Sequence, residues 1–121
     1  MRFLLLAAAL SLAVPAAFAS AERYQIRYAA DLVDVCDTNS RAADAEAAAA
    51  FCHGYLVGAF HFYDAATPPA ARFACAPDPT PSRSEVMNGF VAWAKAHPQH
   101  MQERAVETLF RFLANTYPCT D

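Results

Sequence analysis

Four cysteines are the residues of this sequence whose chemistry is easiest to predict: Cys36, Cys52, Cys75 and Cys119. No two of them stand in the CxxC spacing that a thioredoxin-like redox centre or a zinc knuckle would require. An even number of cysteines in a small exported chain indicates structural disulfides rather than free thiols or a metal site. We therefore expect all four to form disulfide bridges.

Four histidines could in principle bind a metal or act as bases. His97 and His100 are three residues apart across a helix start, but no Asp, Glu or Cys at ligand spacing is expected to complete a site, so we predict a solvated pair of imidazoles. His53 and His61 are eight residues apart on one predicted helix. Without a neighbouring nucleophile, each is better explained as a hydrogen-bonded helix histidine than as a catalytic base.

The remaining polar candidates do not predict an enzyme either. Ser82 and Ser84 look like helix-capping residues, and no GxSxG motif surrounds them. Asp31, Asp34 and Asp37 share a helix face that solvation explains, whereas a paired-carboxylate hydrolase would need a cleft. The sequence thus predicts no catalytic residues, no metal and no cofactor.

The first 19 residues have the pattern of a secretory signal peptide. Arg2 precedes an apolar run at 3–14, and Ala17 and Ala19 form an A-x-A cleavage site. The alternative, a retained membrane anchor, is disfavoured because the run is shorter than the ~20 residues of a spanning helix. We expect cleavage after Ala19, no membrane attachment afterwards, and one domain at 20–121.

The expected mature chain is mildly acidic. Without Arg2 it keeps eight Lys and Arg residues against twelve Asp and Glu residues. No basic stripe is available to neutralise phosphates, so nucleic acid is not an expected partner.

The pattern of apolar residues predicts an all-α fold, a small disulfide-stapled bundle of about four helices. Apolar residues recur at helical spacing, and no strand-like alternation is evident. Five prolines interrupt the chain between Thr67 and Ser82, which predicts one long stiff loop. The third helix is expected to begin with Thr80 as N-cap and Pro81 in its first turn, and the fourth to begin at Pro98. The expected helices cover 28–36, 41–66, 81–97 and 98–117.

The second expected helix is apolar nearly all the way round, which predicts a central and enclosed position. It carries Gly54 and Gly58 in a GxxxG spacing that permits close approach of another helix. Close packing inside the soluble core is the favoured interpretation. Contact with a second subunit is the alternative.

An alternating order of these helices selects one disulfide connectivity. Cys75 in the proline-rich loop and Cys119 after the last helix then lie at one end of the bundle, and Cys36 lies at the other. The ends are separated by much of a helix of ~18 residues, or ~27 Å. Because bridged Cα atoms are only about 4.4 to 6.8 Å apart, we predict Cys75 with Cys119 and Cys36 with Cys52.

Several segments together resemble the Tai-type immunity proteins of type VI secretion. They are the cysteine after the first helix, FCHGYLVGA at 51–59, FACAP at 73–77, WAKAHP at 93–98 and YPC at 117–119. The resemblance covers 31–119. Two features depart from the family pattern: Phe60 to Tyr63 precede Asp64, where an Asp is often found sooner, and the loop at 67–82 is unusually rich in proline.

The resemblance implies a periplasmic, non-catalytic helical protein, commonly a homodimer, that blocks the Cys-His cleft of a peptidoglycan amidase effector. The polar residues at the corner between the last two helices are the predicted contacts with that partner: His97, Gln99, His100 and Gln102. Two alternatives remain open at this point. They are a periplasmic holdase or acid-stress chaperone, and an orphan helical domain of the same family.

Overall fold

A computed structural model describes residues 22–120, and this part of the chain is mostly helical without a named strand. The predicted signal peptide at 1–19 lies outside the described residues. The α-helices are α2 (Ala29–Cys36), α3 (Ala45–Ala66), α4 (Arg83–Ala96) and α5 (Ala105–Thr116). Short 3-10 turns are η1 (Glu22–Tyr24), η2 (Thr38–Ser40), η3 (Pro69–Ala71) and η4 (Pro98–His100). The predicted all-α, disulfide-stapled bundle of four helices is confirmed.

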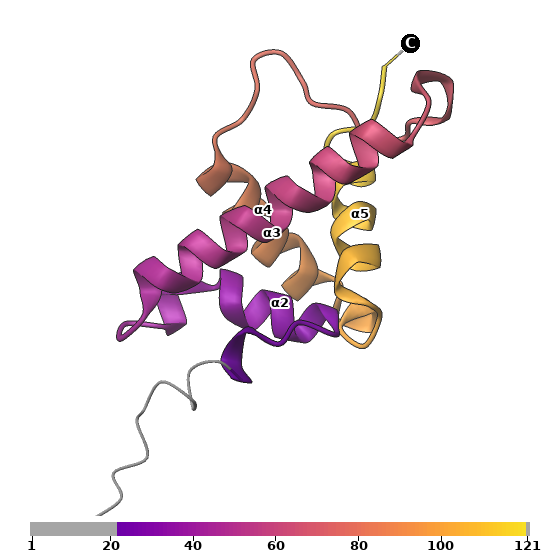
Figure 1. Ribbon diagram of the computed structural model, residues 1–121. Helices are drawn as coiled ribbons and strands as arrows, with labels where there is room; N and C mark the ends of the chain where they lie inside the picture. Colours follow the sequence, from indigo (N-terminus) through magenta and orange to yellow (C-terminus); the bar gives the residue numbers. More distant parts are fainter. Residues whose placement is uncertain (1–21, 121) are drawn as a thin grey trace, which may run out of the picture.

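The short helix α2, rather than α3, is the central element. α3 runs diagonally across the front of the molecule, α2 lies across its lower part, and α5 rises along one side (Figure 1). α2 packs against α3, α4 and α5, and five of its eight residues are buried. α3 buries only Ala48, Cys52, Leu56 and Tyr63. The prediction of an enclosed second helix was therefore wrong.

The length and composition of α3 explain this difference. Its 22 residues extend along the whole bundle, and much of its apolar character comes from Ala and Gly, which have little side-chain surface to bury. Gly54 and Gly58 are exposed, and a Cβ atom added at either would meet nothing within 4 Å. The favoured interpretation of the GxxxG spacing as close packing inside the core was also wrong.

The largest buried side chains belong to the contact between α4 and α5. Phe90 and Phe112 are fully buried and meet edge to face, with ring centroids 5.9 Å apart. Gly89 makes room for this contact, because a Cβ there would lie 3.3 Å from the Phe112 ring. A glycine in α4 therefore allows α5 to approach closely.

Helices α3 and α4 begin later than the sequence pattern predicted. α4 begins at Arg83 with a capping box, in which the Glu85 amide donates to the Ser82 hydroxyl and the Ser82 amide donates to the Glu85 carboxylate. Thr80 and Pro81 thus precede the cap. α3 begins at Ala45, because the chain after Ser40 first makes a turn.

α5 begins at Ala105 rather than at Pro98, for a reason that lies in α2. The carbonyls of Met101 and Glu103 accept hydrogen bonds of 3.0 and 2.9 Å from the amides of Ala30 and Ala29. These amides belong to the first turn of α2, where backbone donors have no partner within their own helix. The segment between η4 and α5 therefore caps α2, and its carbonyls are not free to continue a helix.

Both disulfides connect the predicted partners. Cys36 and Cys52 join the end of α2 to α3, with Cα atoms 5.3 Å apart. Cys75 and Cys119 join the proline-rich loop to the segment after α5, with Cα atoms 4.9 Å apart. The Cys75 amide also donates to the Tyr117 carbonyl at 2.9 Å. The loop is thereby held against the C-terminal end of α5.

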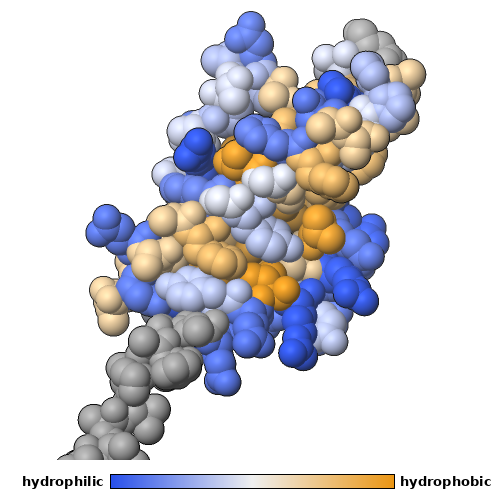
Figure 2. All heavy atoms as spheres, viewed as in Figure 1, coloured by the Kyte–Doolittle hydropathy of each residue, from blue (hydrophilic) through white to orange (hydrophobic). Residues whose placement is uncertain are grey.

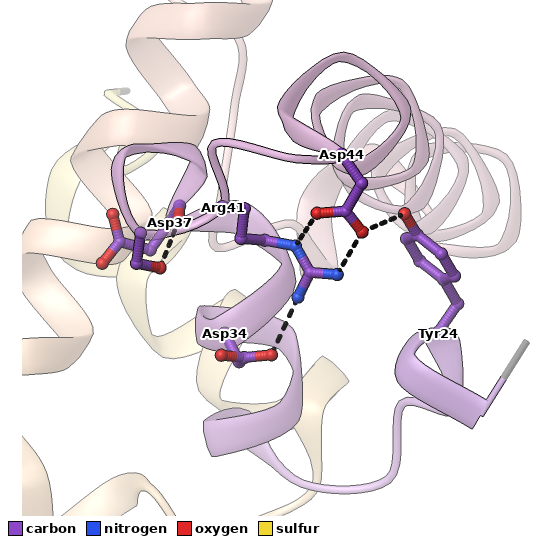
Figure 3. A network of polar contacts seen from close by, with 6 residues as sticks. Tyr24, Asp34, Asp37, Arg41 and Asp44 are labelled. Carbon is purple, nitrogen blue, oxygen red and sulfur yellow. Dashed lines mark hydrogen bonds and ion pairs between the residues drawn. The ribbon is translucent and has the colours of Figure 1, made fainter. Parts of the chain in front are cut away.

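The turn between α2 and α3 is organised around Arg41, whose side chain is nearly buried (Figure 3). Its guanidinium donates to both carboxylate oxygens of Asp44, at 3.1 and 2.7 Å, and to Asp34 at 2.9 Å. The Tyr24 hydroxyl donates to Asp44 at 3.1 Å, and the guanidinium lies over the Tyr24 ring. The hydrogen bonds from Arg41, and to a smaller extent the one from Tyr24, hold the pKa of Asp44 below its usual value.

We expect Asp44 to stabilise the fold in a pH-dependent manner. With its pKa lowered in the folded state, its contribution is complete above the unfolded-state pKa of about 4 and is lost as the pH falls through the lower folded-state pKa. The Asp44→Asn variant should therefore be less stable than the wild type at neutral pH. The difference should shrink on acidification below about pH 4.

Urea unfolding at a series of pH values measures this difference. Asp78→Asn is the matched control, because Asp78 is an exposed loop residue with no ion pair among the described residues. A difference between wild type and Asp44→Asn that stays constant down to the acid transition would contradict the role given to this carboxylate.

Candidate partner-binding surface

The corner between α4 and α5 is built on Trp93. The His97 ring stacks on the Trp93 indole with centroids 4.1 Å apart, and the His100 ring is nearly parallel to the indole at 5.7 Å. His97 Nδ1 also lies 2.7 Å from the Trp93 carbonyl oxygen. Both imidazoles are thus half-buried against tryptophan, and the prediction of a solvated histidine pair was wrong.

Polar contacts fix the same corner from the α5 side. Glu103 pairs with Arg111 at 2.7 Å and with His100 at 2.9 Å. Hydrogen bonds from Arg111, and secondarily from His100, hold the pKa of the Glu103 carboxyl below its usual value. The buried Thr108 hydroxyl donates to the His100 carbonyl at 3.1 Å. The corner, defined here as residues 97–102, is therefore a rigid feature.

Of the four predicted contact residues, Gln99 and Gln102 are the ones fully available to a partner. Both are exposed, and neither side chain makes a hydrogen bond within residues 22–120. His97 and His100 are less available, since their rings stack on Trp93 and both residues are partly buried. Trp93 and Glu103 were not predicted to belong to this corner. Trp93 is four residues from His97, and Glu103 is three residues from His100, spacings that indicate contact on a helical turn.

The other residues considered as candidates do not converge on a reactive site. Asp31 accepts from the amides of Arg27 and Tyr28 at the start of α2, at 3.0 and 2.9 Å. Asp34 pairs with Arg41, and Asp37 pairs with Lys95. Each of these carboxylates has a hydrogen-bond or ion-pair partner in the fold, so they do not form the merely solvated acidic face that was predicted.

The structure confirms the predicted role of Ser82 but not those of Ser84 and His53. Ser82 caps α4 as predicted, whereas Ser84 lies inside the first turn of that helix. His53 and His61 both line a cavity beside α3. The buried Nε2 atom of His53 has no hydrogen-bond partner in the described chain, contrary to the expectation of a hydrogen-bonded histidine. Within residues 22–120, no group of three His, Cys, Asp or Glu side chains could hold a metal ion.

An exposed, mostly apolar face of α3 is the second surface feature. We call it the α3 face and define it by the exposed residues Ala47, Ala50, Gly54, Gly58, Phe62 and Ala65. Phe62 is 76 % exposed, the largest exposure among the big hydrophobic side chains of the described chain. Hydrophobic atoms follow the diagonal course of α3 across the front of the molecule (Figure 2). None of the described helices has the length and hydropathy of a membrane span.

The described chain is a disulfide-stapled helical body with a rigid polar corner and an open apolar helix face. These features are typical of a small protein that binds another protein. The Rap1a immunity protein family model matches residues 28–119, and the chain belongs to this family. Rap1a is an immunity family of type VI secretion, so the expected relationship is confirmed at this level. Proteins of such families are generally non-catalytic. No curated protein and no solved structure matches the chain.

Proposed function

We propose that this protein is a periplasmic immunity protein of the Tai type, which binds a peptidoglycan amidase effector of type VI secretion and blocks its active-site cleft without catalysis. The observation that carries this proposal is the family match over 28–119, which includes all four α-helices. Two disulfides support an oxidising compartment. The signal-like pattern at 1–19 supports export through the inner membrane.

The corner at 97–102 is the surface best suited to enter a cleft. It is a tight turn between two helices, and its backbone is fixed by the stack on Trp93 and by the Thr108 hydroxyl. A rigid surface loses little conformational entropy when it binds. Gln99 and Gln102 supply uncharged donors and acceptors, which suit the polar groups that surround a Cys-His active site.

The test of this function begins with the neighbouring reading frames. A small secreted amidase with a Cys-His pair encoded beside this gene is the expected effector. The purified amidase should lose its peptidoglycan hydrolysis when an equimolar amount of this protein is added, and the two should elute together from a sizing column. Full hydrolysis in the presence of excess protein, with no complex, would overturn the proposal for that amidase.

The double variant Gln99→Ala/Gln102→Ala should bind the effector at least about tenfold more weakly, because central polar contacts of an interface each contribute on the order of 1 kcal/mol or more. Calorimetry measures the affinity. Gln25→Ala, an exposed glutamine before α2, is the matched control and should bind like the wild type. An unchanged affinity of the double variant would remove the corner from the interface.

We also propose that the α3 face joins two copies of the chain in a homodimer. Gly54 and Gly58 are open to solvent, and a GxxxG spacing lets two helices approach closely. Gly58→Leu should give a folded monomer, since a leucine there separates the helices, whereas a Cβ atom added at Gly58 meets nothing within 4 Å in its own subunit. Light scattering measures the mass, and circular dichroism the fold.

Ala92→Leu is the matched control, because it adds a similar bulk to an exposed position of α4. It should leave the dimer intact. If the wild type is a monomer in dilute solution, or if Gly58→Leu remains a dimer, the α3 face is not the subunit interface.

One observation favours the alternative of a holdase. Phe62 and Phe73 are 76 % and 50 % exposed, and holdases bind unfolded clients through exposed apolar side chains. Suppression of the thermal aggregation of an unrelated client protein, lost in Phe62→Ser, would support that function. Aggregation that proceeds unchanged would exclude it.

A further inference from the structure

The two disulfides differ in how closely solvent approaches them. Cys36 and Cys52 are 1 % and 0 % exposed, so the bridge between α2 and α3 is buried. Cys75 and Cys119 are both partly exposed, and Cys75 also lines the cavity beside α3. Disulfide exchange requires a thiolate to reach one of the two bonded sulfur atoms, so access controls its rate. A reductant in solution should therefore react with the second bridge before the first.

Few contacts other than this bridge hold the middle of the proline-rich loop, residues 75–81. The Tyr63 hydroxyl accepts a hydrogen bond of 3.1 Å from the Ala74 amide and fixes the segment before it. The capping box of α4 fixes the segment after it. Between these points, the loop makes one hydrogen bond to another element of the described chain, from the Cys75 amide to the Tyr117 carbonyl. The disulfide is therefore the main attachment of this part of the loop.

The same part of the loop forms one wall of the cavity, which has a volume of about 510 Å³. The opposite wall consists of apolar side chains of α3 and α5, among them Leu56, Phe60, Leu109 and Leu113. The two leucines of α5 are 0 % and 6 % exposed. Movement of the loop away from these helices would bring the apolar side chains into contact with water.

The helices have other contacts that do not involve this bridge. α2 packs against α3, α4 and α5, and its end stays bonded to α3 through Cys36 and Cys52. The buried rings of Phe90 and Phe112 join α4 to α5. Opening the Cys75 to Cys119 bridge should therefore change the loop and leave the helices folded at room temperature.

We propose that the Cys75 to Cys119 bridge is a redox-sensitive switch, which a dithiol reductant opens while the Cys36 to Cys52 bridge stays closed. In the oxidised form the loop is a wall of the cavity. In the reduced form the loop separates from the segment after α5, and the apolar lining becomes accessible. The bridge lies at the end of α5 and the corner at 97–102 precedes its start, so the proposal does not depend on the immunity function.

The exchange is balanced between the protein and the dithiol. One thiolate of the dithiol attacks a sulfur atom of the bridge, forms a mixed disulfide and releases the other cysteine as a thiolate. The second thiolate of the dithiol then displaces the remaining cysteine and closes the reductant's own disulfide. The protein gains two electrons and two protons, and the dithiol loses them.

Timed treatment of the folded protein with dithiothreitol, followed by alkylation with iodoacetamide and peptide mass spectrometry, measures the opening of both bridges. We expect Cys75 and Cys119 to be alkylated at least about tenfold faster than Cys36 and Cys52. The same treatment in urea is the control, and there the two bridges should be reduced at similar rates because neither is buried. Equal rates in the folded protein, or earlier alkylation of Cys36 and Cys52, would overturn the proposal.

Anilinonaphthalene sulfonate, a dye that fluoresces on exposed apolar surface, measures the opening of the cavity in the selectively reduced protein. Its fluorescence should rise on reduction, while the helical signal in circular dichroism stays unchanged. Oxidised glutathione should re-form the bridge and reverse the rise. Selective reduction without a rise in dye fluorescence, or with loss of the helical signal, would overturn the proposed opening.

Two double variants assign the effect to one bridge. Cys75→Ser/Cys119→Ser should bind the dye without reductant as the reduced wild type does, and Cys36→Ser/Cys52→Ser, the matched control, should bind more dye only after dithiothreitol is added. If either variant does not fold, the alkylation rates of the wild type decide the outcome. A folded Cys75→Ser/Cys119→Ser variant that binds no more dye than the oxidised wild type would show that this bridge does not hold the loop and would overturn the proposal.

Discussion

Replacing Cys75 and Cys119 together by serine should lower the free energy of unfolding by about 4 kcal/mol. The two cysteines are separated by 44 residues, and opening so long a closed loop gives the unfolded chain much conformational entropy. Domains of this size have total stabilities of about 5 to 15 kcal/mol, so the variant should be marginally stable at 37 °C. Urea unfolding followed by circular dichroism measures the loss.

The pair Cys36 and Cys52 provides the matched control. It closes a loop with a separation of only 16 residues, so its replacement by serine should cost less, about 3 kcal/mol. Limited proteolysis distinguishes the two further. Only loss of the Cys75 to Cys119 bridge should expose the loop at 72–82 to cleavage in the folded protein. A larger loss of stability from the Cys36/Cys52 variant would contradict this loop-closure account.

Phe112→Ala should destabilise the protein by about 3 to 5 kcal/mol. The Phe112 ring is fully buried and contacts the rings of Phe90, Trp93 and Tyr117, with centroids 5.9, 6.2 and 6.0 Å away. Alanine leaves a cavity that the surrounding helices can close only partly. Chemical denaturation measures the change. Fluorescence of Trp93, the one tryptophan of the chain, should report a loosened corner in the same variant.

Phe62→Ala is the control for this prediction. It removes the same ring from the α3 face, and the comparison is made in the Gly58→Leu background, in which the proposed dimer is absent. There Phe62 is exposed, and its replacement should change the free energy of unfolding by no more than about 0.5 kcal/mol. Comparable losses for Phe62→Ala and Phe112→Ala in that background would contradict the assignment of Phe112, and not Phe62, to the core.

Features set by chain connectivity were predictable from the sequence. The disulfide pairing followed from the order of the helices, because a bridge reaches only a few ångströms while a helix spans tens. The existence of four helices followed from apolar spacing. The end of α4 at His97 followed from Pro98 and was confirmed.

What the sequence did not reveal depends on contacts between distant segments. The late start of α5 results from hydrogen bonds between the carbonyls at 101 and 103 and the first turn of α2, some seventy residues earlier. The exposure of α3 depends on which helices cover it. Because α3 is rich in alanine and apolar on most sides, its sequence does not show which face is buried. Stacking of His97 and His100 on Trp93 also required the geometry of the corner, although the spacing of the three residues was visible.

The two disulfide loops also have an order along the chain. One closes 36–52 and the other 75–119, so neither loop contains or overlaps the other. The cysteines are therefore bonded in consecutive pairs along the chain, the first with the second and the third with the fourth. When a chain enters an oxidising compartment N-terminus first, an enzyme that simply joins successive thiols makes the native pairs. Oxidative folding of this protein should thus require an oxidase and no disulfide isomerase, and its yield should be unaffected by loss of the isomerase.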